Sequence, residues 1–423
     1  MYCGSCLRDN AMATELLARG HDVLLLPVYT PTFTDEPNVS EDHVALGGIS
    51  AYLEQYVPFF RKTPSWLDRL WDSKTILSLA SRKSISVNPK MLGEMTVSVL
   101  RGEDGFQRKE IKKLIEWLKE LPPPDVINLP YTLLIALARP LKEAFNCPVL
   151  CTLQGEDLFL DGLPEPYRSE AMDLIRGQVD EVDLFLSVSE YYAGFMPQYL
   201  GIPPEKIRVV PLGINPNGFA LKKPNASGSF TVGFLGRVAP EKGLHVLAET
   251  YCLLRQSGEL PEARLEVAGY MAADCQPYLR EIEARLREAK LAGEFHYRGV
   301  LDRAEKVAFL RQLDVMSMPA TYNEPKGVSL LEAMACGVPL VQPRRGGFTE
   351  VVERTGGGLL VKPDDPERLA EGILKVYKDT ELEAQLSANG FRGVREHYTV
   401  AHMTDKLLQA YQSVIPVAEN KVA

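Results

Sequence analysis

Two basic residues, Arg237 and Lys242, bracket a turn at which an apolar run ends and a helical pattern begins. A planar guanidinium and a mobile ammonium beside a helix N-terminus can neutralise the charge that builds on a diphosphate as it leaves. Taken alone, the pair is more simply explained as a solvated turn with two surface charges. The diphosphate interpretation therefore depends on what else the chain places beside this turn.

Two carboxylates, Glu324 and Glu332, form the second candidate group. If a helix begins near Gly327, its free amides face the space beyond its end, and Glu332 lies about 7 Å further along the axis. Carboxylates so placed can accept hydrogen bonds from hydroxyls at either end of a sugar nucleotide, with the helix start, Gly327 with Val328 and Ser329, at the phosphates between them. Either carboxylate by itself is more simply a solvated side chain.

Short apolar runs alternate with helical patterns, and this alternation predicts the elements that must position these residues. In the first half, strands are expected at 21–29, 125–129, 149–153, 184–188 and 207–211. In the second half they are expected at 231–235, 264–268, 315–319, 338–342 and 358–361. Regular alternation of this kind predicts an α/β protein with parallel, doubly wound sheets.

The chain is predicted to form two Rossmann-like domains, residues 1–218 and 219–399, with a last helix at about 400–416 that packs on either one. Segment 215–229, rich in Pro, Gly and polar residues, breaks the alternation and predicts an interdomain linker. The chain enters its first helix without a preceding strand, although a doubly wound domain normally has a central strand there. We therefore expect the first strand to be missing from the chain as given, or its slot to be filled by another segment.

Together the motifs resemble the nucleotide-sugar half of the retaining glycosyltransferases of family 4, the glycosyl transferases group 1, which have the GT-B fold with two Rossmann-like domains facing a cleft. The resemblance covers residues 180–400 best. It is carried by the Arg-x4-Lys-Gly turn, by the Glu-x7-Glu block that runs on into Ala333-Met-Ala-Cys-Gly-Val-Pro339, and by Gly346-Gly347 followed by Glu350.

The resemblance implies roles for these residues. It implies that Arg237 and Lys242 bind the donor diphosphate, and Gly236 is a donor-binding candidate beside them. It also implies that Glu324 contacts the transferred sugar and that Glu332 contacts the ribose. On this basis Arg237, Lys242 and Glu324 are the predicted catalytic residues.

The first half of the chain departs from the resembled family at Gln154, which stands where many members have a His near the anomeric carbon and the acceptor. Glutamine can donate and accept hydrogen bonds but cannot take a proton at neutral pH. Gln154 is therefore predicted to position an acceptor hydroxyl without acting as a base. Asn128 also stands where related sequences often carry His. The resemblance places the first Gly-containing loop beside the active site, which makes Gly4 and Ser5 acceptor-side candidates.

Two further features of the sequence point to other functions. Cys3 and Cys6 form a Cys-x-x-Cys pair at a helix start, where redox or metal chemistry is conceivable, but the sequence offers no second Cys pair or nearby His to complete a zinc site. Segment 56–79 combines aromatic and basic residues that could touch an acceptor or make a weak peripheral contact with a membrane surface. A helix packed on its own domain explains this segment more simply.

Composition narrows the function classes. The 423 residues include 47 Lys plus Arg against 56 Asp plus Glu, and the net charge of −9 argues against non-specific nucleic-acid binding. The odd number of scattered cysteines predicts reduced thiols and a cytoplasmic protein. No apolar run approaches the roughly 20 residues of a membrane-spanning helix.

The sequence thus predicts a cytoplasmic hexosyltransferase of carbohydrate biosynthesis. We expect it to move a hexosyl unit, with retention, from a nucleoside-diphosphate sugar to a hydroxyl acceptor that is a glycan, a lipid or a small molecule. No cofactor and no metal ion are expected, because Arg237 and Lys242 can neutralise the leaving group. The alternatives are a catalytically silent sugar-nucleotide-binding protein, or another GT-B sugar enzyme such as a phosphorylase or an epimerase.

Overall fold

The computed structural model describes residues 4–57, 59, 89–222 and 228–416. These residues form two compact units. Unit 1 comprises 212–403 together with 34–36 and the start of the chain up to residue 11, and unit 2 comprises 12–33, 37–211 and the residues after 403, in each case as far as they are described. The domain boundary at residues 218 and 219 stays a prediction.

Unit 1 is built on a six-stranded parallel sheet with the strand order β10-β9-β8-β5-β6-β7. Its strands are β5 (Phe230–Leu235), β6 (Ala263–Ala268), β7 (Phe295–Tyr297), β8 (Val315–Met316), β9 (Leu340–Pro343) and β10 (Gly358–Val361). The order reverses between β5 and β8, and ligands of open α/β sheets bind beyond the carboxyl ends of strands at such a point. The predicted doubly wound sheet is confirmed. Strand β7 is missing from the sequence prediction because it is short and only half-buried.

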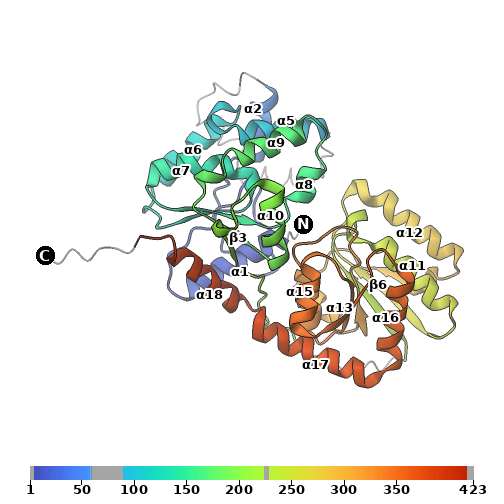
Figure 1. The fold of residues 1–423 in the computed structure, drawn as a ribbon. Helices are drawn as coiled ribbons and strands as arrows, with labels where there is room; N and C mark the ends of the chain where they lie inside the picture. The colour runs from blue at the N-terminus through green and yellow to red at the C-terminus, as the bar shows by residue number, and fades with distance from the viewer. Residues whose placement is uncertain (1–3, 58, 60–88, 223–227, 417–423) are drawn as a thin grey trace. The chain divides into compact units, whose positions relative to one another are not determined.

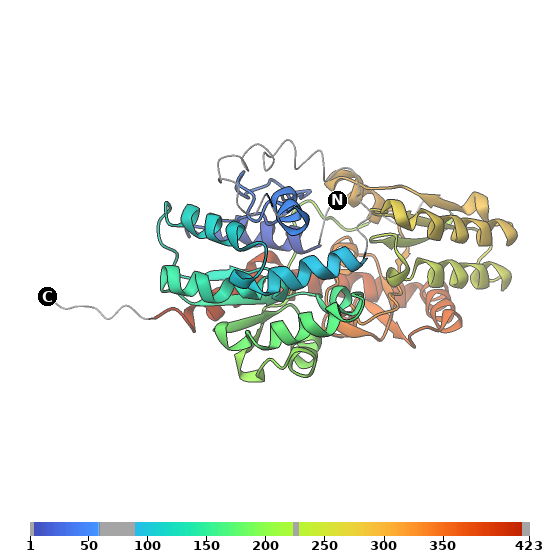
Figure 2. The ribbon, with the colours of Figure 1, turned by 90° about the horizontal axis from the view of Figure 1, so that it is seen from above.

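Helices connect these strands and pack on one another outside the sheet. Helix α11 packs against α16, and α15 packs against α17 (Figures 1 and 2). Helix α14 also packs against α17. The helix start predicted at Asp365 is confirmed, because its carboxylate accepts a hydrogen bond from the Arg368 amide at 3.1 Å and Pro366 occupies the first turn. The helices are α11 (Leu244–Gln256), α12 (Gln276–Glu288), α13 (Arg303–Leu310), α14 (Val328–Ala335), α15 (Gly346–Thr355), α16 (Pro366–Lys378) and α17 (Thr380–His397). The last helix, α18 (Val400–Gln412), begins in unit 1 and belongs to unit 2 from residue 404 onward.

Unit 2 contains a four-stranded parallel sheet in the order β1-β2-β3-β4. Its strands are β1 (Ile127–Leu129), β2 (Val149–Leu153), β3 (Leu184–Ser187) and β4 (Ile207–Val209). Strand β2 is buried along its whole length, as expected for a parallel strand covered on both faces. The helices before and between these strands are α2 (Gly48–Tyr56), α5 (Pro89–Leu100), α6 (Arg108–Leu118), α7 (Ala138–Phe145), α8 (Asp157–Asp161), α9 (Tyr167–Arg176) and α10 (Glu190–Leu200). The first helix, α1 (Gly4–Ala18), begins in unit 1 and belongs to unit 2 from residue 12 onward.

The strand predicted at 21–29 is wrong. Among the described residues this stretch makes a single bridge, between Val28 and Ala45, and none of the described residues before Ile127 joins the sheet of unit 2. Pro27 has no amide to donate, and Leu24 is 42% exposed, so the apolar run does not form a buried, continuously paired strand. Separately, no described helix is both long and apolar enough to span a bilayer.

Candidate active site

The turn after β5 packs closely against the loop after β8. Gly243 has a φ of +76°, and a Cβ at this position would lie 1.8 Å from the carbonyl oxygen of Pro319, so only glycine fits there. Gly236 is similarly close, because its Cβ would lie 2.8 Å from the sulfur of Met318. These close approaches bring the predicted basic turn and the predicted acidic loop together at the point where the strand order reverses.

Lys242 and Glu324 form a largely buried ion pair at this junction. The Lys242 ammonium donates to Glu324 Oε2 and, at 2.7 Å, to the hydroxyl of Tyr322, which itself donates to Glu324 Oε2. Burial by itself raises the pKa of Glu324, but the charges of Lys242 and Lys326 outweigh it and bring that pKa to about 2. Glu324 is therefore a fixed, ionised hydrogen-bond acceptor at neutral pH.

Arg237 lies on the same turn but closer to solvent. Its side chain is 43% exposed and pairs with Glu241, which stands four residues later within the predicted motif. The Glu241 carbonyl in turn accepts the amide of Thr321 at 3.0 Å, which ties the turn to the loop after β8. An exposed ion pair of this kind contributes little to stability, so the Arg237 guanidinium is free to change partners when an anion arrives.

Gly346 and Gly347, at the start of α15, support the Glu324 loop from the other side. The Gly347 amide donates to the Glu324 carbonyl at 2.8 Å, and a Cβ on Gly346, whose φ is +53°, would lie 2.5 Å from that same oxygen. The glycine pair was part of the sequence motif, but the motif predicted no role for it. The structure shows that the pair lets a helix N-terminus approach the backbone of the acidic loop.

The start of α14 lies beside the first residues of the chain within unit 1. Lys326 donates to the Ser5 hydroxyl at 3.1 Å, and a Cβ on Gly4 would lie 3.9 Å from a methyl group of Val328. Gly327 precedes the first turn of α14, to which Ser329 also belongs. The structure therefore brings the acceptor-side candidates Gly4 and Ser5 next to the predicted phosphate-binding helix start.

Glu332 follows on α14 and is 7% exposed. It is ion-paired with Lys306, the first of several partners that sequence reasoning missed. Together with Val328, Arg8 and Arg303, it lines a pocket of unit 1. The ion pair between Lys306 and Glu332 could not be predicted from the sequence, because no local pattern connects these two residues.

Gln154 lies at the end of β2 in unit 2 and is 4% exposed. Its amide donates to the Pro130 carbonyl at 2.7 Å. Because a carbonyl can only accept, the amide nitrogen must face Pro130, which leaves Gln154 Oε1 as the free acceptor. That oxygen is buried and has no hydrogen-bond partner in the part of the chain that the structure describes. Asn128 instead accepts a hydrogen bond from the Thr152 hydroxyl at 3.1 Å.

Glu156 organises the loop that carries Gln154. Its Oε2 accepts the amides of Gln154 and Gly155 at 2.8 and 2.9 Å, and its Oε1 accepts the Thr132 hydroxyl at 3.1 Å. The Thr132 amide also donates to Oε1, at 3.3 Å. A buried carboxylate that collects this many donors fixes the backbone around it. The feature of the sequence that could have identified Glu156 is its position as an acidic residue directly after Gly155.

Other predictions stay open. Cys3 lies outside the described residues, as does most of segment 56–79, so neither the dithiol nor the membrane-contact interpretation can be followed in the structure. Within the described ranges, His, Cys, Asp and Glu side chains form no group of three or more that could hold a metal ion. That no metal is needed remains a prediction.

Comparison with known proteins matches both halves of the chain to sequence families. Residues 219–392 match glycosyl transferases group 1, and residues 96–217 match glycosyltransferase family 4. The chain is 29% identical over 313 residues to D-inositol 3-phosphate glycosyltransferase of Stackebrandtia nassauensis, covering 69% of this chain and 68% of the relative. It is 30% identical over 189 residues to phosphatidyl-myo-inositol mannosyltransferase of Mycobacterium tuberculosis, covering 44% and 47%.

Solved structures agree at the level of the fold. Anabaena Alr3699/HepE in complex with UDP-glucose superposes with a TM-score of 0.64 at 19% identity, covering 93% of this chain and all of that one. The resemblance drawn from the Arg-x4-Lys-Gly turn and the Glu-x7-Glu block is confirmed at the level of the family. The chain belongs to the glycosyltransferases of group 1 and family 4, enzymes of the GT-B fold.

Proposed function

We propose that this glycosyltransferase moves a hexosyl unit from a nucleoside-diphosphate sugar to a hydroxyl acceptor with retention of configuration. The observation that carries the proposal is the Lys242–Glu324 pair, a largely buried cation and a carboxylate that is ionised at neutral pH, held together where the strand order reverses. The helix start at Gly327 and the exposed guanidinium of Arg237 flank the same loops. Such a site suits a ligand with a diphosphate at one point and hydroxyls beside it.

In the proposed reaction, the bond between the anomeric carbon and the diphosphate oxygen breaks while a bond to the acceptor oxygen forms on the same face of the sugar. The acceptor proton passes to the leaving diphosphate oxygen, so no protein base is required. Arg237 and Lys242 neutralise the charge that develops on that diphosphate, and amides at the start of α14 add their dipoles. Glu324 accepts hydrogen bonds from hydroxyls of the transferred sugar and holds its orientation.

Binding of a nucleoside diphosphate is the first test. We expect UDP, GDP or ADP to raise the midpoint of thermal unfolding, and the nucleotide that does so identifies the donor base. A ligand at 100 times its dissociation constant that binds only the native state stabilises it by about 2.7 kcal/mol. The matched nucleoside without phosphates and inorganic phosphate serve as controls, and a repeat with a chelator tests whether a metal takes part. A chain that unfolds cooperatively but responds to none of the three nucleotides contradicts the proposal.

Product formation separates transfer from silent binding. Inositols and inositol phosphates are the first acceptors to try, since two of the relatives are named for inositol-containing acceptors. A product that needs both donor and acceptor supports transfer. Tight nucleotide binding without sugar release, whatever the acceptor, supports the silent binding protein instead.

The unpartnered oxygen of Gln154 leads to a prediction on the acceptor side. Gln154→Met is expected to raise the acceptor KM about tenfold, the effect of losing one hydrogen bond, and to leave the nucleotide affinity unchanged. Gln178→Met is a matched control, because the Gln178 amide also donates to backbone carbonyls, those of Leu100 at 3.0 Å and Leu174 at 2.8 Å. An unchanged acceptor KM in Gln154→Met removes this residue from the acceptor site.

A further inference from the structure

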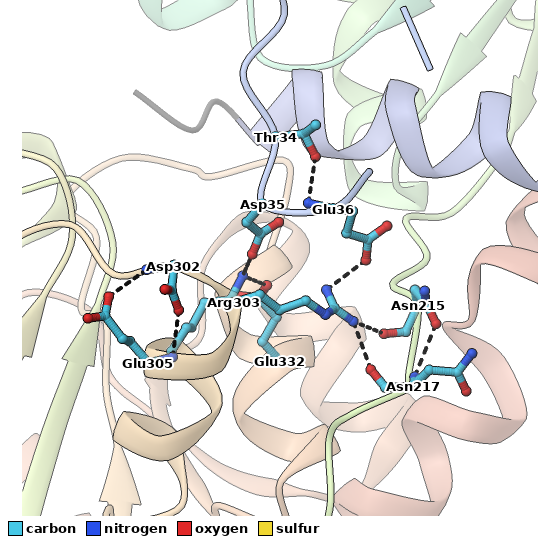
Figure 3. Close-up of polar contacts among 10 residues, drawn as sticks. Thr34, Asp35, Glu36, Asn215, Asn217, Asp302, Arg303, Glu305 and Glu332 are labelled. Carbon is cyan, nitrogen blue, oxygen red and sulfur yellow. Dashed lines mark hydrogen bonds and ion pairs between the residues drawn. The ribbon is translucent and has the colours of Figure 1, made fainter. Parts of the chain in front are cut away.

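Lys306, on α13, is buried between two carboxylates that come from distant parts of the sequence. It is 8% exposed, and its ammonium donates to Asp35 Oδ2 at 2.6 Å and to Glu332 Oε1. Figure 3 shows the Asp35 and Glu332 side chains converging on this point. Burial alone would lower the pKa of Lys306, but Glu332 and Asp35 raise it, so the cation persists at neutral pH.

A second ion pair lies beside the first but does not include Glu332. Arg303 donates to Glu36 at 2.6 Å and to the carbonyl oxygens of Asn215 and Asn217 at 3.0 and 2.9 Å (Figure 3). The adjacent acidic residues Asp35 and Glu36 thus pair with two basic residues of the same helix. Only the Asp35 pair continues to α14, although Glu36 and Arg303 line the same pocket as Glu332.

Glu332 keeps one oxygen available for a ligand. Its Oε1 is held by Lys306, whereas its Oε2 makes no hydrogen bond to any described residue, and the side chain lines the pocket of unit 1 next to Val328. Asp35, Lys306 and Glu332 together carry one net negative charge. Such a group repels phosphate and favours a neutral hydroxyl that donates its proton to the free oxygen.

We propose that Lys306 is a positioning residue that fixes the side chain of Glu332 as the acceptor for a ribose hydroxyl of the nucleotide donor, and that Asp35 shares the charge of Lys306. This inference rests on the proposed function, in which the diphosphate lies at the start of α14 and Glu332 follows one turn further along the helix. Without Asp35, Lys306 pairs with Glu332 alone, and this stronger ion pair makes Glu332 a weaker hydrogen-bond acceptor for the ribose hydroxyl. Without Lys306, two buried carboxylates repel each other and the side chain of Glu332 loses its fixed orientation.

The test compares ribonucleotides with their deoxy forms. The probes are UDP, GDP and ADP together with their 2′-deoxy and 3′-deoxy counterparts. The readout is the dissociation constant of each deoxy form divided by that of the matching ribonucleotide. In the wild type we expect at least one deoxy form of the bound nucleotide to bind roughly 10- to 100-fold more weakly, as for a lost hydrogen bond to a charged group. In Lys306→Met this ratio is expected to fall to within about threefold of unity, while affinity for that deoxy form changes little.

Two further variants complete the design. Lys306→Arg keeps the positive charge and is expected to keep most of the ratio, and Asp35→Asn is expected to give an intermediate value. These two carry the test if Lys306→Met does not fold. Lys222→Met is the matched control, because Lys222 also forms a mostly buried ion pair in unit 1, with Glu383, but does not belong to the lining of this pocket, and the ratio is expected to stay at the wild-type value.

The outcomes distinguish this inference from the proposed function. If the wild type binds none of the nucleotides, the proposed function fails and the inference fails with it. If the wild type binds a nucleotide but treats its ribo and deoxy forms alike, only the inference is overturned. A wild-type ratio in Lys306→Met, or in Asp35→Asn where Lys306→Met is unfolded, also overturns it. So does a loss of the ratio in Lys222→Met as large as in the Lys306 variant.

Discussion

The Arg237→Ala variant is expected to turn over about 10²- to 10³-fold more slowly than the wild type at saturating donor, as removal of one preorganised charge-stabilising donor does in other enzymes. Its guanidinium pairs with Glu241 on an exposed part of the turn after β5. Charge on the leaving diphosphate increases as the glycosidic bond breaks, so the interaction with Arg237 is stronger in the transition state than in the ground state. The effect should therefore appear in kcat and not only in KM.

The stability of the same variant should be unchanged, because an exposed ion pair contributes about 0–1 kcal/mol. Arg139→Ala is a matched control, since Arg139 also forms an exposed pair with a glutamate four residues later, Glu143, on a helix of unit 2. Glu241→Gln releases Arg237 from its partner and is expected to leave turnover near the wild-type value. Near-normal turnover in Arg237→Ala, measured alongside these controls, removes Arg237 from the diphosphate site.

The Lys242→Met variant is expected to lose both activity and stability. Lys242 is the main cation facing Glu324, whose side chain is 5% exposed. Removing one member of a buried pair typically costs about 3–5 kcal/mol, because the other charge stays buried without its partner. Turnover should fall by at least about 10²-fold for the reason given for Arg237. Urea unfolding and kcat measured on the same preparation check the two parts, with Lys242→Arg as the charge-preserving comparison.

The pH dependence of stability tests this pair independently. The pKa of Glu324 is lowered from 4.5 to about 2 on folding, so the folded state binds the proton more weakly than the unfolded state. The stabilisation is therefore fully present above the unfolded pKa, and it is lost as the pH falls from about 5 toward 2. Glu324→Gln lacks this titration. The difference in unfolding free energy between wild type and variant should shrink across that range, and a constant difference contradicts the assignment.

Much of this protein is predictable from short stretches of sequence. Parallel strands that are buried along all or most of their length, such as β2 and β5, are continuous apolar runs, and the helix start at Asp365 is a local pattern of capping residue and proline. The turn with Arg237 and Lys242 and the loop with Glu324 follow strands directly, so the strand order of a doubly wound sheet brings them to one edge. For these features the necessary information lies within a few residues of each position.

Local patterns fail where pairing decides the outcome. Residues 21–29 have the apolar character of a strand, but a strand also needs a neighbour with free backbone groups, and Val28 makes only a single bridge with Ala45. The role of Gly346 likewise depends on how closely α15 approaches the Glu324 carbonyl. Neither the partner of a strand nor the closeness of two backbones is encoded in the periodicity of one segment.

By itself, the sequence determined the fold class and the family, because both depend on residue types at short, fixed spacings, and it predicted the residues that we propose to bind the donor. Only the tertiary structure decided how those residues are held. Lys306 meets Asp35 across 271 positions and Glu332 across 26, and Tyr322 completes the Lys242–Glu324 pair from a loop 80 positions after that lysine. Burial makes such charges depend strongly on a few contacting groups. The packing of the whole unit determines which groups contact these charges, and no single segment of the sequence encodes that packing.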